Sequence, residues 1–96
     1  GILEIGIGSG AQSALLSRLV SPVVSVDNDA RILRTASVNL QRFGPETLLV
    51  QSDAFSLPFR DACFSVGLSQ GLMEHCSDDA FAKLLREQLR VCRSVV

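Results

Sequence analysis

The residues best suited to chemistry stand near the start of the chain, in residues 3–10, where one carboxylate precedes three alternating glycines. Gly6, Gly8 and Gly10 have no side chains, so a ligand can approach the backbone of this run closely. A helix that begins directly after the run would direct its free N–H groups and its dipole toward an anionic part of that ligand. Glu4 lies in the apolar part of the run, and a buried carboxylate must have polar partners. The run therefore predicts the binding loop of a nucleotide or a related cofactor.

Further polar residues that could bind the same ligand follow three later apolar stretches. Asp27, Asp53 and Gln70 each stand at or just after the end of such a stretch. Parallel strands bring their carboxyl ends to one edge of a sheet, and ligands bind at that edge. We therefore expect these residues to converge with the glycine run on one ligand. Structural alternatives exist, because Asp27 and Asn28 could serve only as helix caps, Asp53 only as a turn former, and the Glu4 carboxylate only as a partner of the glycine loop.

The elements that must position these residues alternate between strand and helix patterns. Short β-branched or apolar stretches predict strands at residues 2–5, 23–26, 48–50 and 64–69. Helical spacing of apolar residues predicts helices over residues 11–20, from the caps at 27–29 to about residue 43, and from the cap at Ser77 onward. The last helix should bury a stripe made of Phe81, Leu84, Leu85, Leu89 and Cys92. Strict alternation of this kind predicts an α/β fold with a parallel sheet and right-handed crossovers.

Composition narrows the possible classes of protein. The chain has 96 residues, a net charge of -1 and 47% hydrophobic residues, which fits one globular unit without the basic excess that indicates nucleic acid. Its apolar runs are shorter than the roughly 20 residues of a membrane span. The three cysteines lack zinc-site spacing, so we expect no metal site and reduced, mostly buried thiols in a cytoplasmic protein.

Taken together, the motifs resemble those of the class I S-adenosylmethionine-dependent methyltransferases, in particular the small-molecule type. The matching segments are Glu4 to Gly10, Val26-Asp27, Ser52-Asp53-Ala54, Leu57-Pro58-Phe59 and the block from Phe64 to His75. The resemblance implies a Rossmann-like sheet with strand order 3-2-1-4 and one partial cofactor-binding domain over residues 1–96. It also implies that the last three strands of that fold are missing. The strand at 64–69 would then be a bare edge, and the piece alone would be marginally stable and prone to associate.

The resemblance implies S-adenosylmethionine as the cofactor and a role for each matching position. The glycines would contact its methionine part, Asp27 would accept from the ribose hydroxyls, and Asp53 would accept from the adenine amino group. Glu4 would orient the loop, and Gln70 would close the methionine end of the site. The full set of expected cofactor-binding residues is Glu4, Gly6, Ile7, Gly8, Gly10, Asp27, Asn28, Asp53, Ala54 and Gln70.

The expected activity is methyl transfer to an unidentified acceptor, with a small molecule as the leading class. Glu74 and His75 follow the fourth strand and are the candidate catalytic residues, although a structural or gating role fits His75 better than a catalytic one. Transfer from an activated methyl donor depends mainly on alignment and exclusion of water, so a strong general base is required only if the acceptor must lose a proton.

Two other functions remain open from the sequence. Gly6-x-Gly8-x-x-Ala11 with Asp27 placed 21 residues after Gly6 also satisfies the fingerprint of a nicotinamide dinucleotide domain, as in a dehydrogenase. The carboxylate of Glu4 and the block around Asp53 argue against that alternative. A methyltransferase-like module that binds its cofactor or a partner without turnover is the second alternative.

Overall fold

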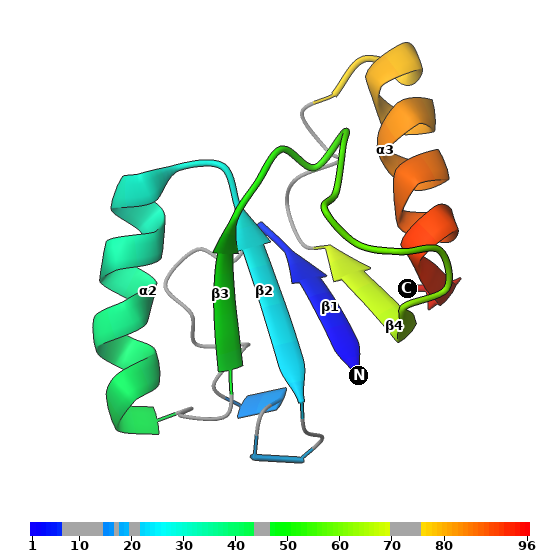
Figure 1. Cartoon of the computed structure of the whole chain (residues 1–96). Helices are drawn as coiled ribbons and strands as arrows, with labels where there is room; N and C mark the ends of the chain where they lie inside the picture. The colour runs from blue at the N-terminus through cyan, green and yellow to red at the C-terminus, as the bar shows by residue number, and fades with distance from the viewer. Residues whose placement is uncertain (7–14, 17, 20–21, 44–46, 70–75) are drawn as a thin grey trace.

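The computed structural model describes residues 1–6, 15–16, 18–19, 22–43, 47–69 and 76–96. Its centre is a five-stranded sheet in the order β3-β2-β1-β4-β5, in which all neighbouring strands are parallel (Figure 1). The strands are β1 (Ile2–Ile5), β2 (Val23–Asp27), β3 (Thr47–Gln51), β4 (Phe64–Ser69) and β5 (Cys92–Val95). The predicted α/β class and the predicted order of the first four strands are confirmed.

Of the helices whose bounds fall within the described residues, α2 (Ala30–Phe43) lies beside β3 and α3 (Asp78–Val91) lies beside β4 and β5 (Figure 1). Helix α2 begins at Ala30, and Oδ1 of the preceding Asp29 accepts the N–H of Arg31 at 2.9 Å, so one of the three predicted caps serves this end. The helix buries Ala36 and Leu40 against β3. At the start of α3 the hydroxyl of Ser77 accepts the N–H of Ala80 at 3.2 Å, which confirms the predicted cap.

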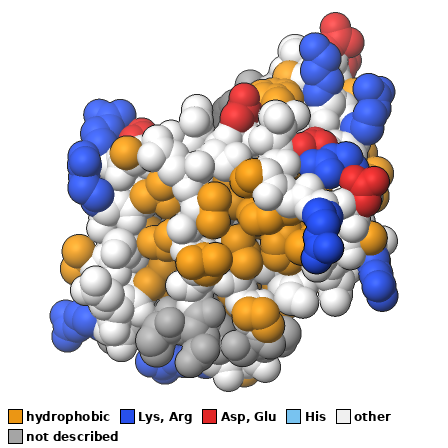
Figure 2. All heavy atoms as spheres, in the orientation of Figure 1, with side chains coloured by type: hydrophobic (Ala, Val, Ile, Leu, Met, Phe, Trp, Pro, Cys, Tyr) orange, Lys and Arg blue, Asp and Glu red, His pale blue; other side chains and the backbone are white. Residues whose placement is uncertain are grey.

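The main core lies between the sheet and the segment 52–63, which crosses from the end of β3 to the start of β4. Leu57 of this segment is buried together with Leu3 and Ile5 of β1. The rings of Phe59 and Phe64 meet edge to face, with their centroids 5.0 Å apart. Hydrophobic side chains also gather on the outer surface over the middle of this face, while charged side chains lie toward both sides of it, over α2 and over α3 (Figure 2).

The fifth strand corrects two expectations. Helix α3 ends at Val91, and Cys92 adopts extended backbone (φ -120°, ψ 144°) instead of continuing the helix. β5 then pairs in parallel with β4, so the expected bare edge at residues 64–69 is wrong. The physical reason is that the open edge of β4 offers backbone groups that the last residues of the chain can satisfy.

The buried face of α3 also differs from the expected stripe. Phe81 and Leu89 are 42% and 54% exposed, whereas Leu84, Gln88 and Val91 are buried. Leu89 lies about 100° around the helix from Gln88, which removes it from the face that contacts the sheet. The stripe was therefore right for Leu84 and wrong for Phe81 and Leu89, and the buried Cys92 lies in β5 rather than in the helix.

The cysteines are free thiols, as expected, but only Cys92 is fully buried. Burial raises the pKa of the Cys92 thiol to about 11, so this group stays protonated at neutral pH. Cys63 is exposed and Cys76 half-buried, so the expectation of mostly buried thiols is wrong. Cys63 stands in the turn just before β4, where the core does not cover it.

Candidate functional site

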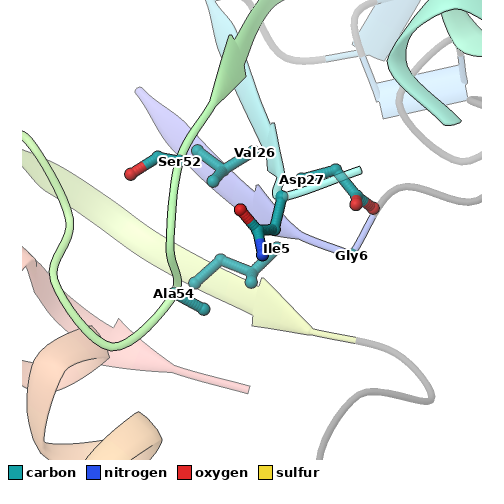
Figure 3. A pocket seen from close by; sticks show the side chains of 7 residues that line it. Ile5, Gly6, Val26, Asp27, Ser52 and Ala54 are labelled. Carbon is teal, nitrogen blue, oxygen red and sulfur yellow. The ribbon is translucent and has the colours of Figure 1, made fainter. Parts of the chain in front are cut away.

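A pocket of about 90 Å³ lies at the carboxyl ends of the central strands, at the edge where the sequence predicts a ligand (Figure 3). Three chain segments meet there, namely the ends of β1, β2 and β3 with the residues that follow them. The lining residues are Ile5, Gly6, Val26, Asp27, Asn28, Ser52 and Ala54. Four of the predicted cofactor-binding residues, Gly6, Asp27, Asn28 and Ala54, are thus brought together at one pocket.

Gly6 ends β1 in a conformation that favours glycine. Its φ is 78°, in the left-handed region where a side chain would be strained. Its N–H donates to the carbonyl of Val26 at 2.9 Å, which fixes the end of β1 against β2. The turn required by the sequence pattern is therefore present at its first glycine.

Asp27 combines a pocket position with a local structural role. Its side chain is half-buried, and its Oδ1 accepts the N–H of Asp29 at 2.9 Å. The carbonyl of Asp27 accepts the N–H of Ser52 at 3.1 Å, and the carbonyl of Asn28 accepts from Gln51 Nε2 at 3.2 Å. These bonds join the ends of β2 and β3, and Asp27 lies at the wall of the pocket.

Asp53 lies next to the pocket, but it is not among the described residues that line it. Its side chain is exposed, and its Oδ1 accepts the N–H of Phe55 at 2.9 Å. This bond is the one expected if Asp53 serves as a turn former. Ala54, the next residue, faces the pocket. The structure therefore places the turn, and not the Asp53 side chain, at this wall of the pocket.

Glu4 is also outside the described pocket wall. Its side chain is 2% exposed, and its Oε1 accepts from the Ser25 hydroxyl at 3.4 Å. Glu4 and Ser25 are register partners on adjacent strands. Alternation along β1 directs Glu4 to the opposite sheet face from Ile5. Glu4 thus stands beneath the start of the glycine run as a buried, partnered carboxylate.

The remaining predicted positions, Ile7, Gly8, Gly10, Gln70, Glu74 and His75, lie outside the described residues. Sequence reasoning missed three lining residues, Ile5, Val26 and Ser52. A signal existed for the first two, because Ile5 and Val26 are the last residues of the strands that the sequence predicts at 2–5 and 23–26. Ser52 directly precedes the predicted Asp53.

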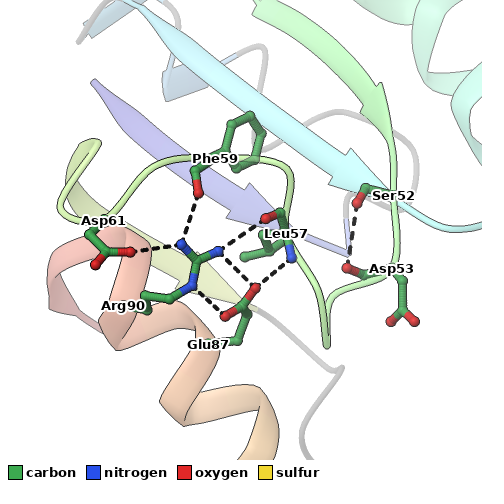
Figure 4. A network of polar contacts seen from close by, with 7 residues as sticks. All are labelled: Ser52, Asp53, Leu57, Phe59, Asp61, Glu87 and Arg90. Carbon is green, nitrogen blue, oxygen red and sulfur yellow. Dashed lines mark hydrogen bonds and ion pairs between the residues drawn. The ribbon is translucent and has the colours of Figure 1, made fainter.

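A polar network anchors the segment that carries Ser52 and Ala54 to α3 (Figure 4). Both Oε atoms of Glu87 accept from Arg90, at 2.7 and 2.9 Å, and Oε2 also accepts the N–H of Leu57 at 2.6 Å. Arg90 donates further to the carbonyls of Leu57 and Phe59 and to Asp61. Hydrogen bonds from Arg90 hold the pKa of Glu87 below its ordinary value and raise the pKa of Arg90. The network gives the pocket wall a fixed support.

The described part of the site has a definite chemical character. Ile5, Val26 and Ala54 offer apolar walls for a flat ring, while the carboxylate of Asp27 can accept from two neighbouring hydroxyls. Within the described ranges, no group of three or more His, Cys, Asp or Glu is placed to hold a metal ion. Likewise, no helix among these residues has the length and apolar character needed to cross a bilayer.

Known proteins share this architecture. A family model described as a methyltransferase domain matches residues 2–94. Protein-L-isoaspartate O-methyltransferase from Nitrobacter winogradskyi is 32% identical over 84 residues, which cover 86% of this chain and 39% of that protein. The YcgJ protein from Bacillus subtilis has a TM-score of 0.84 at 32% identity, over 95% of this chain and 38% of that one. A SAM-dependent methyltransferase from Methanosarcina mazei has a TM-score of 0.84 at 26% identity, over 95% and 46%.

The chain spans less than half the length of each of these three proteins. The family model, in contrast, covers all but a few terminal residues of the chain. The chain therefore belongs to the methyltransferase domain family, as its resemblance to the class I S-adenosylmethionine-dependent methyltransferases predicted.

Proposed function

We propose that this chain is a single S-adenosylmethionine-binding domain, residues 1–96, of a methyltransferase, and that the pocket at the sheet edge holds the adenosine part of the cofactor. The observation that carries the proposal is the meeting of Gly6, Asp27 and Ala54, from three separate segments, at one pocket. The family match favours this cofactor over the nicotinamide dinucleotide of the dehydrogenase alternative.

In this proposal, different residues of the pocket contact the ribose and the adenine ring of the cofactor. The ribose hydroxyls donate to Asp27, whose orientation is set by the N–H of Asp29. The adenine ring packs between Ile5, Val26 and Ala54, with the backbone N–H of Ala54 beside it. Asp53 supports this wall through its turn and reaches the adenine amino group only at the rim. Glu4 orients the glycine run from beneath.

The cofactor supplies a methyl group that is already activated on a sulfonium. The domain then contributes alignment and exclusion of water. The other predicted contacts, from Ile7, Gly8, Gly10 and Gln70, and the catalytic candidates Glu74 and His75, remain part of the proposal.

For the acceptor we propose a small molecule, in a cytoplasmic setting that fits the free thiols. The Leu57-Pro58-Phe59 segment, typical of the small-molecule type, supports this choice. The main competitor comes from the name of the Nitrobacter relative, which specifies an L-isoaspartate residue of a protein.

The test combines cofactor binding with methyl transfer. Replacing Asp27 with asparagine should weaken binding of S-adenosylmethionine, measured by calorimetry, by about 10-fold or more, because a charge-assisted bond contributes about 1.5–3 kcal/mol. Asp79→Asn, which removes an exposed carboxylate from the first turn of α3, is the matched control and should bind as the wild type does. Equal affinity of the Asp27 variant and the wild type would remove Asp27 from the site.

Transfer of a labelled methyl group separates the remaining alternatives. The full-length protein would be supplied with labelled cofactor and either an isoaspartyl peptide or a pool of small metabolites. Label in the small-molecule fraction is expected. Label only in the peptide would show that the acceptor is a protein residue and not a small molecule. Cofactor binding without transfer to any acceptor would support the non-catalytic module.

A further inference from the structure

A second hollow, of about 210 Å³, lies between Phe55 and one face of α3. Its lining residues are Phe55, Lys83, Arg86 and Glu87. None of these residues lines the pocket at the sheet edge. Lys83 and Arg86 are three residues apart on the helix, so their side chains share one face.

The charge of this hollow is positive and uncompensated within the described residues. Lys83 and Arg86 are exposed, and neither side chain forms a salt bridge or a hydrogen bond with any residue that the structure describes. Glu87 does not neutralise them, because both of its oxygens accept from Arg90 and one also accepts from Leu57. Within the part of the chain that the structure describes, both cations are therefore available to an external anion.

The apolar side of the hollow is held in place before any ligand arrives. The side chain of Phe55 is 45% exposed, so part of its ring is available to a ligand. Its N–H donates to Asp53 Oδ1 at 2.9 Å, and the N–H of Ser56 donates to the carbonyl of Asp53 at 3.1 Å. This turn fixes the backbone that carries the ring, which lowers the cost of ordering it when a ligand binds.

We infer that this hollow binds a small aromatic anion, a flat ring that carries a phosphate or carboxylate group. The ring packs on Phe55, and the anionic group lies between Lys83 and Arg86. The site is additional to the proposed cofactor pocket and does not depend on methyl transfer.

Amide chemical shifts during titration of the chain test this inference. Phenyl phosphate should shift the amides of Phe55 and of residues 83–87, and should bind about 10-fold more tightly than inorganic phosphate or benzyl alcohol, which each lack one half of the recognised chemistry. The variant Lys83→Gln/Arg86→Gln should lose about 10-fold or more of that affinity. The control variant Arg34→Gln/Arg60→Gln removes two exposed cations elsewhere and should bind as the wild type does.

Three results would overturn the inference. Phenyl phosphate could bind no more tightly than inorganic phosphate, the Lys83/Arg86 variant could match the control variant, or the shifts could fall at Asp27 and Ala54 instead. Circular dichroism shows whether each variant is folded. We expect all of them to fold, because the substituted positions are exposed. A failure here leaves cofactor binding at Asp27 unaffected, so the two proposals are tested separately.

Discussion

Replacing Gln88 with methionine should stabilise the folded chain. Gln88 is 0% exposed on the face of α3 that contacts the sheet. Neither its Nε2 nor its Oε1 has a hydrogen-bond partner among the described residues. A buried polar group without a partner costs free energy because it has lost its bonds to water. Methionine has a similar length and no such requirement, and its flexible side chain adapts to the space.

The expected change in the free energy of unfolding follows from the complete burial of the Gln88 side-chain amide. An unsatisfied buried group costs about 1–3 kcal/mol, and replacing it with an apolar group of the same shape removes that cost. We therefore expect Gln88→Met to raise the free energy of unfolding by about 1–3 kcal/mol. For a domain of this size, each kcal/mol corresponds to about 4–8 °C in Tm.

Urea denaturation followed by circular dichroism measures the change. The matched control is Gln41→Met on the exposed side of α2, which should alter the free energy of unfolding by less than about 0.5 kcal/mol. A loss of stability of about 1 kcal/mol or more for Gln88→Met would refute the reasoning, because it would show that the amide has partners in the folded chain.

Three further changes test other parts of the packing. In Gly67→Ala the new Cβ would lie 2.7 Å from the Sγ of Cys92, so the free energy of unfolding should fall by about 1–3 kcal/mol in urea denaturation, and by less in a Cys92→Ala background. An equal loss in both backgrounds would contradict the clash. Ala62 has a φ of 53°, so Ala62→Gly should relieve about 1 kcal/mol of strain and raise Tm by about 4–8 °C, and a lower Tm would count against strain there. Hydrogen bonds from Arg90 lower the folded-state pKa of Glu87, so its stabilising effect is complete above about pH 4.5 and is lost as pH falls through the folded-state value. Glu87→Gln should therefore be less stable than wild type at pH 7 and approach it in acid, whereas a constant difference at all pH values would exclude this linkage.

Much of the fold was predictable because its signals are local. The β-branched run at 23–26, the cap at Ser77 and the glycine that ends β1 each depend on neighbours in sequence. The position of Gly6 and Asp27 at one sheet edge followed from a topological rule for parallel sheets, whereas Ala54 was expected only from the resemblance to the methyltransferases.

Three missed features depend on contacts between distant segments. β5 forms because the edge of β4 is available, and its sequence Cys92-Arg93-Ser94-Val95 has no pattern that separates it from the end of a helix. The burial of Gln88 in place of Leu89 is set by how α3 rotates against the sheet. The bonds of Arg90 to Leu57 and Phe59 span more than thirty residues, and no spacing rule indicates them.

Methyl and amide chemical shifts recorded during titration with S-adenosylmethionine test the central claim most directly. The account predicts saturable shifts of Ile5, Val26, Asp27 and Ala54 with no comparable shifts of the methyl groups of Leu84, which lies in the core beneath α3. Titration with nicotinamide dinucleotide should leave the chemical shifts of these four residues unchanged. Saturable shifts with the dinucleotide and none with S-adenosylmethionine would contradict the account.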